Sequence, residues 1–491
     1  MPLIGGTRSP VPLPIFGKNS LAATDHMPQG YTASATGCTW DGQAIRQSKG
    51  RTRLNSSAAF SSNAVNAGFD FQTPNGKVEI ICGANGTIAK IVNGTVTNIV
   101  TGRMVNSIHR GDTFMGKLIL TNGFDQPIAF PINADASTGP EVLTAPNSFY
   151  GITYNNHFFV AHQPDGSNGP SVVQNSASRD LSTFNVLNAY NIESNNNDVV
   201  RAFFKIGGYL GIAKQGSLTL MRGSNFDQTN SGYDAYLLPP YTGGGIFSQG
   251  SVTYDRYGRV YYFNDTGFWR LDGVDKPPVL ISKTIDPDMR RVNLGRVEEI
   301  TGIHVPSLQE MWWSVPVGGD FEFWRYVYRP DSLRNGIGAW WPMPWTDVTA
   351  LWTYESSPDQ STPRCGTQTG FAYKMDDSWS DNGSAYNSHV EFNNIRGSMD
   401  RSAFWKWVIG TYENTGVPFT LEAFPEDQRQ AAIVSRTVTP SAAQNTLTAD
   451  ANVPISGRSK YLTIKVSNAT ANRPWAVRDM TVVSQGSGDF I

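Results

Sequence analysis

Histidine and acidic side chains are the groups in this sequence that could perform acid–base or metal chemistry, but their spacing favours neither. The six histidines are His26, His109, His157, His162, His304 and His389. His157 and His162 are the nearest pair, and five positions apart on one strand they would face opposite sides of it. We therefore expect no metal site at this pair.

Paired carboxylates are the other catalytic candidates, because a retaining glycoside hydrolase needs two carboxyl groups about 5 Å apart. The candidates are Asp255, Asp265, Asp272, Asp320 and Glu322. Most of them lie at turn-like positions, where an Asp side chain caps the local backbone. The sequence also lacks a GxxxxGKS/T phosphate loop and a GxSxG nucleophile elbow. We predict that the chain is not an enzyme and has no catalytic, cofactor-binding or metal-binding residues.

The composition narrows the class of protein. The chain has 491 residues, a formal net charge of −2 and only 16% charged residues. Its length predicts two or three domains, and its charge lacks the basic footprint of a nucleic-acid-binding protein. Cys38, Cys82 and Cys365 are far apart in sequence, without zinc or disulfide spacing, and we expect them to be small buried hydrophobic residues.

Seven tryptophans crowd one stretch of the chain, from Trp312 to Trp352. If exposed, they could stack on sugar rings or nucleic-acid bases. Because several of them lie within strand-like runs, we favour packing between sheets.

The clearest structural signal is the stretch Gly245–Gly273, which predicts a tight antiparallel meander. Its three apolar runs are separated by turns that end in Gly258 and Gly267 and contain Asp or Asn. The middle run, Val260–Phe263, is large on both faces, so this strand should be covered on both sides. A sheet packed between other sheets is a propeller blade. The high content of glycine and aromatic residues likewise indicates an all-β class.

The same pattern recurs along the chain. Six apolar runs, each followed by a glycine turn and a second run, are centred on Ile80, Leu118, Phe158, Leu210, Val260 and Met311. These centres lie 38, 40, 52, 50 and 51 residues apart, a period typical of propeller blades. A seventh candidate is Arg364–Met375, around Gly370. We predict a six- or seven-bladed β-propeller, with a pair of β-sandwiches as the alternative.

The two ends of the chain differ from the repeat. Residues 1–65, rich in Pro, Ser, Asn and Gly, are predicted to be an N-terminal extended arm that lies on another domain, orders against a partner or frays. Residues 66–385 would form the propeller, and residues 386–491 a C-terminal β-sandwich. The strand candidates of the sandwich are Ser402–Val408, Phe419–Phe424, Ile433–Thr439, Tyr461–Val466 and Met480–Val483, with polar loops such as Pro440–Asp450 between them.

No signal peptide or membrane-spanning segment is expected. The first residues lack a basic region followed by an apolar one, and no apolar run approaches the ~18 residues of a membrane span. The segment Arg222–Gly245 is a candidate contact loop because it is long and has an exposed-type composition.

Segments spread over most of the chain resemble, in their order, the β-propeller tail nozzle or head-to-tail hub proteins of short-tailed bacteriophages (podoviruses). Near the start they are Phe16–Leu21, Gly30-Tyr31, Trp40–Gly42, Ile45-Arg46 and Gly50. In the middle they are Leu118–Phe130, Tyr262-Phe263, Gly267-Phe268, Asp272-Gly273 and Ile281-Ser282. Near the end they are Phe404–Lys406, Thr420–Ala423, Gly457-Arg458 and Leu462–Val466.

This resemblance implies a structural virion protein of a phage tail, without enzymatic activity or cofactors, that is soluble in the host cytoplasm before assembly. It implies a homo-oligomer, a hexameric ring, below a portal or adaptor protein, with a tail fibre or tip protein attached below. DNA would pass through the lumen during ejection without sequence-specific binding. The low charge suits such a conduit, because each Lys or Arg contact to a phosphate adds a salt-dependent attraction.

Two other functions remain open from the sequence. A carbohydrate-binding or polysaccharide-degrading β-propeller would need the Trp312–Trp352 cluster beside a carboxylate pair in one cleft. A protein-interaction scaffold of cellular origin is the third hypothesis, although the standard propeller repeat signatures are missing.

Overall fold

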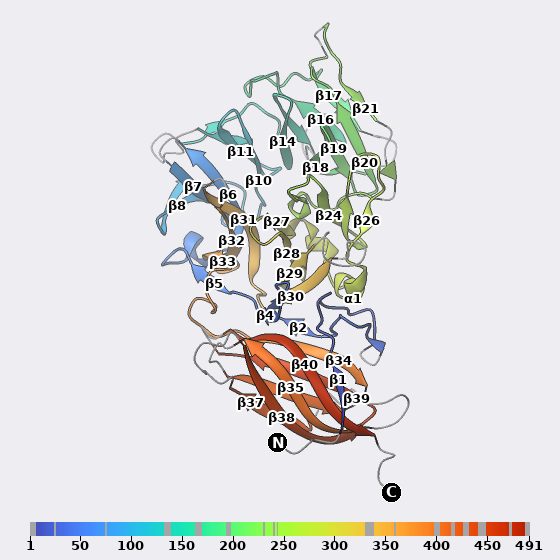
Figure 1. Cartoon of the computed structure of the whole chain (residues 1–491). Helices are drawn as coiled ribbons and strands as arrows, with labels where there is room; N and C mark the ends of the chain where they lie inside the picture. The colour runs from blue at the N-terminus through green and yellow to red at the C-terminus, as the bar shows by residue number, and fades with distance from the viewer. Residues whose placement is uncertain are drawn as a thin grey trace.

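Strands dominate this molecule (Figure 1). The computed structural model describes residues 6–23, 26–73, 76–131, 139–161, 163, 169–192, 198–228, 231–238, 241–242, 244–328, 338–357, 360–396, 403–413, 418–425, 432–439, 448–470 and 474–486. Its helices are short: α1 (Asp286–Met289) and the 3₁₀ helices η2 (Ala59–Ser62), η4 (Gln249–Ser251), η5 (Lys283–Ile285) and η6 (Leu294–Glu299). The all-β prediction is confirmed. No helix in these ranges is long and apolar enough to cross a membrane.

The larger part of the structure is a series of small antiparallel sheets that follow one another along the chain. The first is β6 (Val65–Thr73), β7 (Gly76–Gly83), β8 (Ile88–Val92) and β9 (Thr95–Val100). The second is β10 (Arg110–Phe114), β11 (Lys117–Thr121), β12 (Ile128–Phe130) and β13 (Glu141–Val142). The third is β14 (Tyr150–Tyr154), β15 (His157–Ala161), β16 (Val172–Asn175) and β17 (Ala189–Asn191).

Four more sheets continue the series. The fourth is β18 (Val200–Ile206), β19 (Tyr209–Lys214), β20 (Ser217–Arg222), β21 (Tyr236–Leu237) and β22 (Tyr241–Thr242). The fifth is β23 (Thr253–Tyr254), β24 (Val260–Asn264), β25 (Gly267–Leu271) and β26 (Val279–Leu280). The sixth is β27 (Thr301–Val305), β28 (Glu310–Val317), β29 (Asp320–Val327) and β30 (Ala339–Met343). The seventh is β31 (Val348–Ser357), β32 (Gln360–Thr367), β33 (Ala372–Met375) and β5 (Arg51–Arg53), which comes from the other end of the chain.

Each of these sheets packs on the next through an apolar cluster, and the last packs on the first. In the closing cluster, Trp352 of β31 lies with Val65 of β6 and Ile81 of β7. On β24, Tyr262 belongs to the cluster shared with the fourth sheet and Tyr261 to the cluster shared with the sixth. The strand is therefore covered on both sides, as its sequence predicted. This closed ring of antiparallel sheets confirms the prediction of a β-propeller.

The repeat predicted from the sequence matches the strands. All six predicted centres lie on the second strand of a sheet, and the candidate at Arg364–Met375 covers parts of β32 and β33. The glycine turn expected after the run centred on Phe158, at Gly166, lies outside the described residues.

The rest of the chain forms two larger sheets, here called the terminal two-sheet unit, which lie below the ring in Figure 1. One sheet contains β1 (Thr7–Pro10), β3 (Cys38–Trp40), β4 (Ile45–Gln47), β35 (Ala403–Glu413), β38 (Thr448–Ser459) and β40 (Ala476–Gly486). The other contains β2 (Ala35–Thr36), β34 (Ser388–Arg396), β36 (Phe419–Pro425), β37 (Val434–Val438) and β39 (Tyr461–Asn468). Both sheets share one apolar core, which also includes Val327, Ala339 and Trp341 of the sixth ring sheet.

The strand predictions for the end of the chain are confirmed at β35, β36, β37, β39 and β40. The sequence missed β34 and β38. Treating Pro440–Asp450 as one polar loop was wrong for its last residues, because 448–450 begin β38 by pairing with β35. Residues 440–447 lie outside the described residues.

Described residues of the predicted N-terminal arm supply strands to both parts of the molecule. Residues 6–23 and 26–53, here called the N-terminal strut, supply β1, β3 and β4 to one terminal sheet, β2 to the other and β5 to the ring. Between these strands, Gly17 bridges to Trp340 of β30 and Lys18 pairs with Asp288 of α1 at 2.9 Å. The strut therefore lies on its own chain and connects the ring to the terminal unit.

Candidate functional site

The ring is closed by β5, which pairs with β33. In this register Arg53 lies opposite Tyr373 and Arg51 opposite Met375. The strand is flanked on its other side by residues 378–384: Arg51 N donates to Ser380 O at 3.1 Å, and Asn382 N donates to Arg51 O at 2.7 Å. Gly50 must be glycine there, because a Cβ would lie 2.1 Å from Ser380 O. A segment of three residues thus joins the last ring sheet to the chain that leads into the terminal unit.

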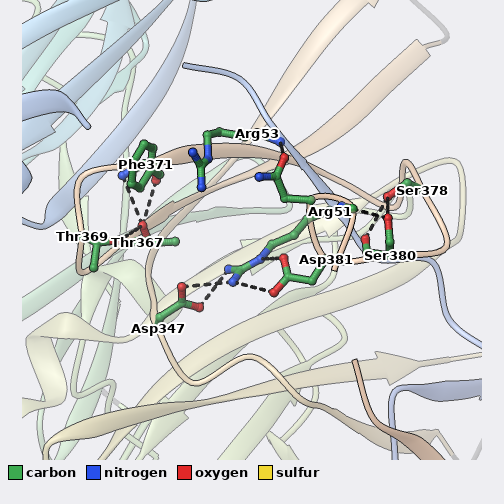
Figure 2. Close-up of polar contacts among 11 residues, drawn as sticks. Arg51, Arg53, Asp347, Thr367, Thr369, Phe371, Ser378, Ser380 and Asp381 are labelled. Carbon is green, nitrogen blue, oxygen red and sulfur yellow. Dashed lines mark hydrogen bonds and ion pairs between the residues drawn. The ribbon is translucent and has the colours of Figure 1, made fainter. Parts of the chain in front are cut away.

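Arg51 is the charged centre of this closure, and Figure 2 shows its guanidinium between two carboxylates. Nη1 and Nη2 donate to Asp347 at 2.8 and 3.1 Å. Nε and Nη2 donate to Asp381 at 2.7 and 3.2 Å. The guanidinium also lies 4.4 Å from the ring centroid of Tyr373, and the side chain is 6% exposed. Two bidentate pairs on one buried arginine hold three distant segments together.

The electrostatics of Arg51 favour its charged form. Burial alone would lower the pKa of Arg51, but the carboxylates of Asp381 and Asp347 more than offset that effect and raise it above the ordinary value. The Cys365 thiol is itself buried, and burial raises its pKa to about 12, so it is not a reactive thiolate. Cys38 and Cys82 are also buried and free, which confirms the expectation for all three cysteines.

The structure describes one histidine of the candidate pair, His157. His157 is buried, and its Nδ1 lies 2.8 Å from Ser176 O and 3.3 Å from Asn175 Nδ2. His162 lies outside the described residues. The described part of the chain contains no group of three or more metal-ligating side chains.

The acidic candidates have separate local partners. Asp255 Oδ1 accepts from Tyr257 N at 2.9 Å and from Arg259 N at 3.0 Å, which confirms its role in the turn. Asp272 pairs with Arg270 at 2.7 Å.

The other three acidic candidates are also at structural positions. Glu322 pairs with Arg291 at 2.9 Å, and burial raises the pKa of Glu322 although that arginine opposes the rise. Asp265 lies in the turn between β24 and β25, and Asp320 begins β29. No pair of the five acids is held together by an interaction described for these residues.

The tryptophans of the 312–352 stretch are all buried. Trp312 Nε1 donates to Glu310 at 2.7 Å, and Arg325 Nε donates to the same carboxylate oxygen at 2.7 Å. The Arg325 guanidinium lies 4.8 Å from the Trp312 ring centroid. These contacts confirm the packing role, so the rings do not form a surface for stacking sugars.

A polar network at the inner ends of the ring sheets was not predicted from the sequence. The carboxylate of Glu298, from η6, accepts from Tyr150 Oη at 2.8 Å and pairs with Arg201 at 3.3 Å. Arg110 Nη2 donates to the Glu298 backbone oxygen. Burial raises the pKa of Glu298, and the neighbouring arginines and the Tyr150 hydroxyl oppose this rise. Arg110, Tyr150 and Arg201 all lie at the beginning of the first strand of a sheet, a shared repeat position that could have revealed them.

Comparisons with known proteins add little to this description. No family model and no curated protein matches the chain. Among solved structures, BamB from Moraxella catarrhalis has a TM-score of 0.36 at 10% identity, covering 70% of this chain and 96% of that one. The computationally designed Ika8 protein has a TM-score of 0.37 at 12% identity, covering 66% and 99%. Sqt1 of Saccharomyces cerevisiae has a TM-score of 0.39 at 9% identity, covering 67% and 98%.

Proposed function

We propose that this protein is a structural component of a short phage tail, of which several copies form a ring below a portal or adaptor protein. In this proposal each of the seven ring sheets is a blade of a seven-bladed β-propeller, and the terminal two-sheet unit is a β-sandwich. The ring of copies conducts DNA during ejection and holds fibres or tip proteins. The resemblance of the ordered segments to tail nozzle and hub proteins is the starting point of this proposal.

The observation that carries the proposal is the N-terminal strut, which joins the propeller and the terminal unit into one body. Residues of the segment Phe16–Leu21, which carries part of the resemblance, make the contacts between the strut and the ring. Gly17 forms a β-bridge to Trp340, and a Cβ on Gly17 would lie 2.4 Å from the Trp340 backbone oxygen. Lys18 Nζ and Ser20 Oγ donate to Asp288 at 2.9 and 2.7 Å. A body braced in this way suits a protein that must keep its shape while other virion proteins attach to it.

The lumen for DNA would lie between copies rather than inside one propeller. The cavities lined by the first strands of the sheets measure about 320 and 220 Å³, the volume of a small-molecule site and far below that of a duplex. A closed ring of copies uses two different, complementary patches on each copy.

The segment Arg222–Gly245 is a candidate for one of these patches. Asp234 fixes its base by accepting from Ser224 N at 2.8 Å and Asn225 N at 2.6 Å. Tyr236 and Leu237, which follow Asp234 in the sequence and form β21, are exposed. Residues 229–230, 239–240 and 243 of the segment lie outside the described residues.

The assembly state tests the proposal. We would purify the protein alone and together with the products of the neighbouring reading frames, and analyse both samples by light scattering and electron microscopy. A ring of copies, alone or on an adaptor, is expected. A strict monomer at high concentration that no neighbouring product recruits would overturn the proposal.

Two further measurements sharpen the result. Replacing Tyr236 and Leu237 by Ser should weaken assembly, whereas Tyr257→Ser, an exposed aromatic change on another sheet, serves as the matched control. The carbohydrate hypothesis depended on accessible tryptophans, which are buried here. A glycan array with a polysaccharide-degradation assay separates it from the tail proposal, because only a carbohydrate-active propeller would bind or release sugar.

A further inference from the structure

Two adjoining cavities lie where the first strands of the ring sheets converge. The larger measures about 320 Å³ and the smaller about 220 Å³. Asn66, Arg110 and Thr301 line both of them, so these residues form their common wall. The three residues come from the first, second and sixth sheets, which places the cavities at the axis of the ring.

Arg110 has no carboxylate partner in this wall. Its Nη2 donates to a backbone carbonyl oxygen, that of Glu298, and no ion pair of Arg110 occurs within the described ranges. The Glu298 carboxylate is instead engaged by Tyr150 and Arg201. Burial lowers the pKa of Arg110, and the nearby Glu298 and Tyr150 do not restore it, whereas Arg51 with its two carboxylates has a raised pKa. Arg110 is therefore a half-buried cation with incomplete compensation.

The other charged groups of the larger cavity neutralise each other. Arg296 Nε and Nη2 donate to the Glu299 carboxylate at 2.8 and 2.6 Å, and its Nη1 donates to Gly318 O at 2.9 Å. Arg110 therefore leaves the lining of this cavity with one net positive charge.

One neutral donor, the Thr301 hydroxyl, lies in the same wall as that charge. Thr301 Oγ1 accepts from Leu351 N at 3.1 Å, and its own hydrogen has no acceptor among the interactions of the described residues. His109 lines the smaller cavity and is 1% exposed, yet neither of its ring nitrogens has a hydrogen-bond partner in the described structure. Both nitrogens are enclosed by protein atoms, so His109 forms part of the wall of this cavity.

The backbone opposite Arg110 leaves room for its guanidinium. A Cβ on Gly250 would lie 2.8 Å from Arg110 Nη2 and 2.2 Å from Ile300 O, so any larger residue would displace the arginine or the chain. The position of the cation is thus built into the fold.

We propose that the axial cavities bind a small oxyanion, a phosphate or a short carboxylate, through Arg110. An oxyanion completes the charge compensation of the guanidinium through charge-assisted hydrogen bonds, and Thr301 supplies a neutral donor beside it. The cavity volumes admit one small anion and exclude a polymer such as nucleic acid. This site is independent of the tail assembly proposed above.

Titration calorimetry and thermal unfolding of the full chain test this site, with sodium phosphate and sodium acetate as probes and sodium chloride at equal ionic strength as the control. Saturable binding of one anion per chain, with a higher melting temperature than in chloride, is expected for at least one probe. Phosphate binding alone identifies a phosphate site, and acetate binding alone a carboxylate site. Melting temperatures no higher than in chloride, without binding heat, would overturn the proposal.

Two variants change the affinity in opposite directions. Arg110→Gln should weaken binding at least tenfold, because it removes the uncompensated positive charge that the described residues place in the cavity lining. Glu298→Gln keeps the shape of the side chain but removes a negative charge near Arg110, so it should bind the anion several-fold more tightly. A gain of affinity cannot result from misfolding. Unchanged binding in Arg110→Gln, or weaker binding in a folded Glu298→Gln protein, would overturn the assignment.

Discussion

Replacing Arg51 with Met removes the charge that closes the ring while keeping an apolar stem of similar length. The arginine is 6% exposed, and its four hydrogen bonds to Asp347 and Asp381 range from 2.7 to 3.2 Å. The variant leaves these two carboxylates facing each other without a cation, and it removes the stacking on Tyr373. The ring closure should therefore weaken while the rest of each sheet stays intact.

The size of the effect follows from burial. Removing one partner of a buried ion pair costs about 3–5 kcal/mol, because the remaining charge is left uncompensated. The Asp347 and Asp381 side chains are 31% and 27% exposed, so water can solvate them again and the lower end applies. Loss of the cation–π contact adds about 0.5–1 kcal/mol. We expect the free energy of unfolding to fall by about 3.5–4 kcal/mol.

Equilibrium urea unfolding followed by tryptophan fluorescence measures this loss. Arg53→Met is the matched control on the same strand, because Arg53 is exposed and its main side-chain contact is the Phe371 ring at 4.0 Å. The control should lose less than about 1 kcal/mol. Adding Asp347→Asn to Arg51→Met should show non-additive losses. Equal losses in the two arginine variants would refute the assignment of Arg51 as the closing residue.

Two further predictions concern the histidines His109 and His389 and the close packing at Gly68. Burial lowers the pKa of His109 and His389 to about 4 from an ordinary 6.5, with smaller contributions from nearby basic residues. The unfolded chain binds more protons between these values, so the free energy of unfolding should fall as the pH drops from 6.5 to about 4, by roughly 3 kcal/mol per histidine. His109→Asn should flatten this dependence in urea titrations at several pH values, and an unchanged slope would contradict it. Gly68→Ala places a Cβ 2.2 Å from the Trp352 ring and should lower the free energy of unfolding by about 1–3 kcal/mol. Gly319→Ala places its Cβ in open space, so this control should have nearly the stability of the wild type. Similar losses of stability in both variants would contradict the close packing at Gly68.

The ring could be predicted because its signals are local. The turn at Asp255 depends on hydrogen bonds to backbone groups two and four residues ahead. Along Val260–Phe263, successive side chains pack in turn against the two neighbouring sheets. Large residues on both faces of the strand therefore indicate in the sequence that both faces are buried. The packing role of the tryptophans followed from the same kind of pattern. In each case a few consecutive residues contain the physical reason for the structure.

The strand that closes the ring could not be predicted in this way. β5 contains Arg51, Thr52 and Arg53, which have no apolar pattern, and its partner strand lies at the far end of the repeat. Asp381 is 330 positions from Arg51. The strand β34, which the sequence analysis missed, likewise pairs with β2 of the N-terminal strut and with β39. No local sequence pattern identifies these partners.

The sequence by itself determined the β class, the repeat and the turns, because these depend on side chains within a few residues of one another. The tertiary structure alone decided where the strut runs and which charges meet at the axis. Arg110 and Glu298 are 188 positions apart, and Tyr150 is 148 positions from Glu298. They meet because sheets packed side by side bring their first strands to a common axis, and that convergence is a property of the closed ring rather than of any single segment.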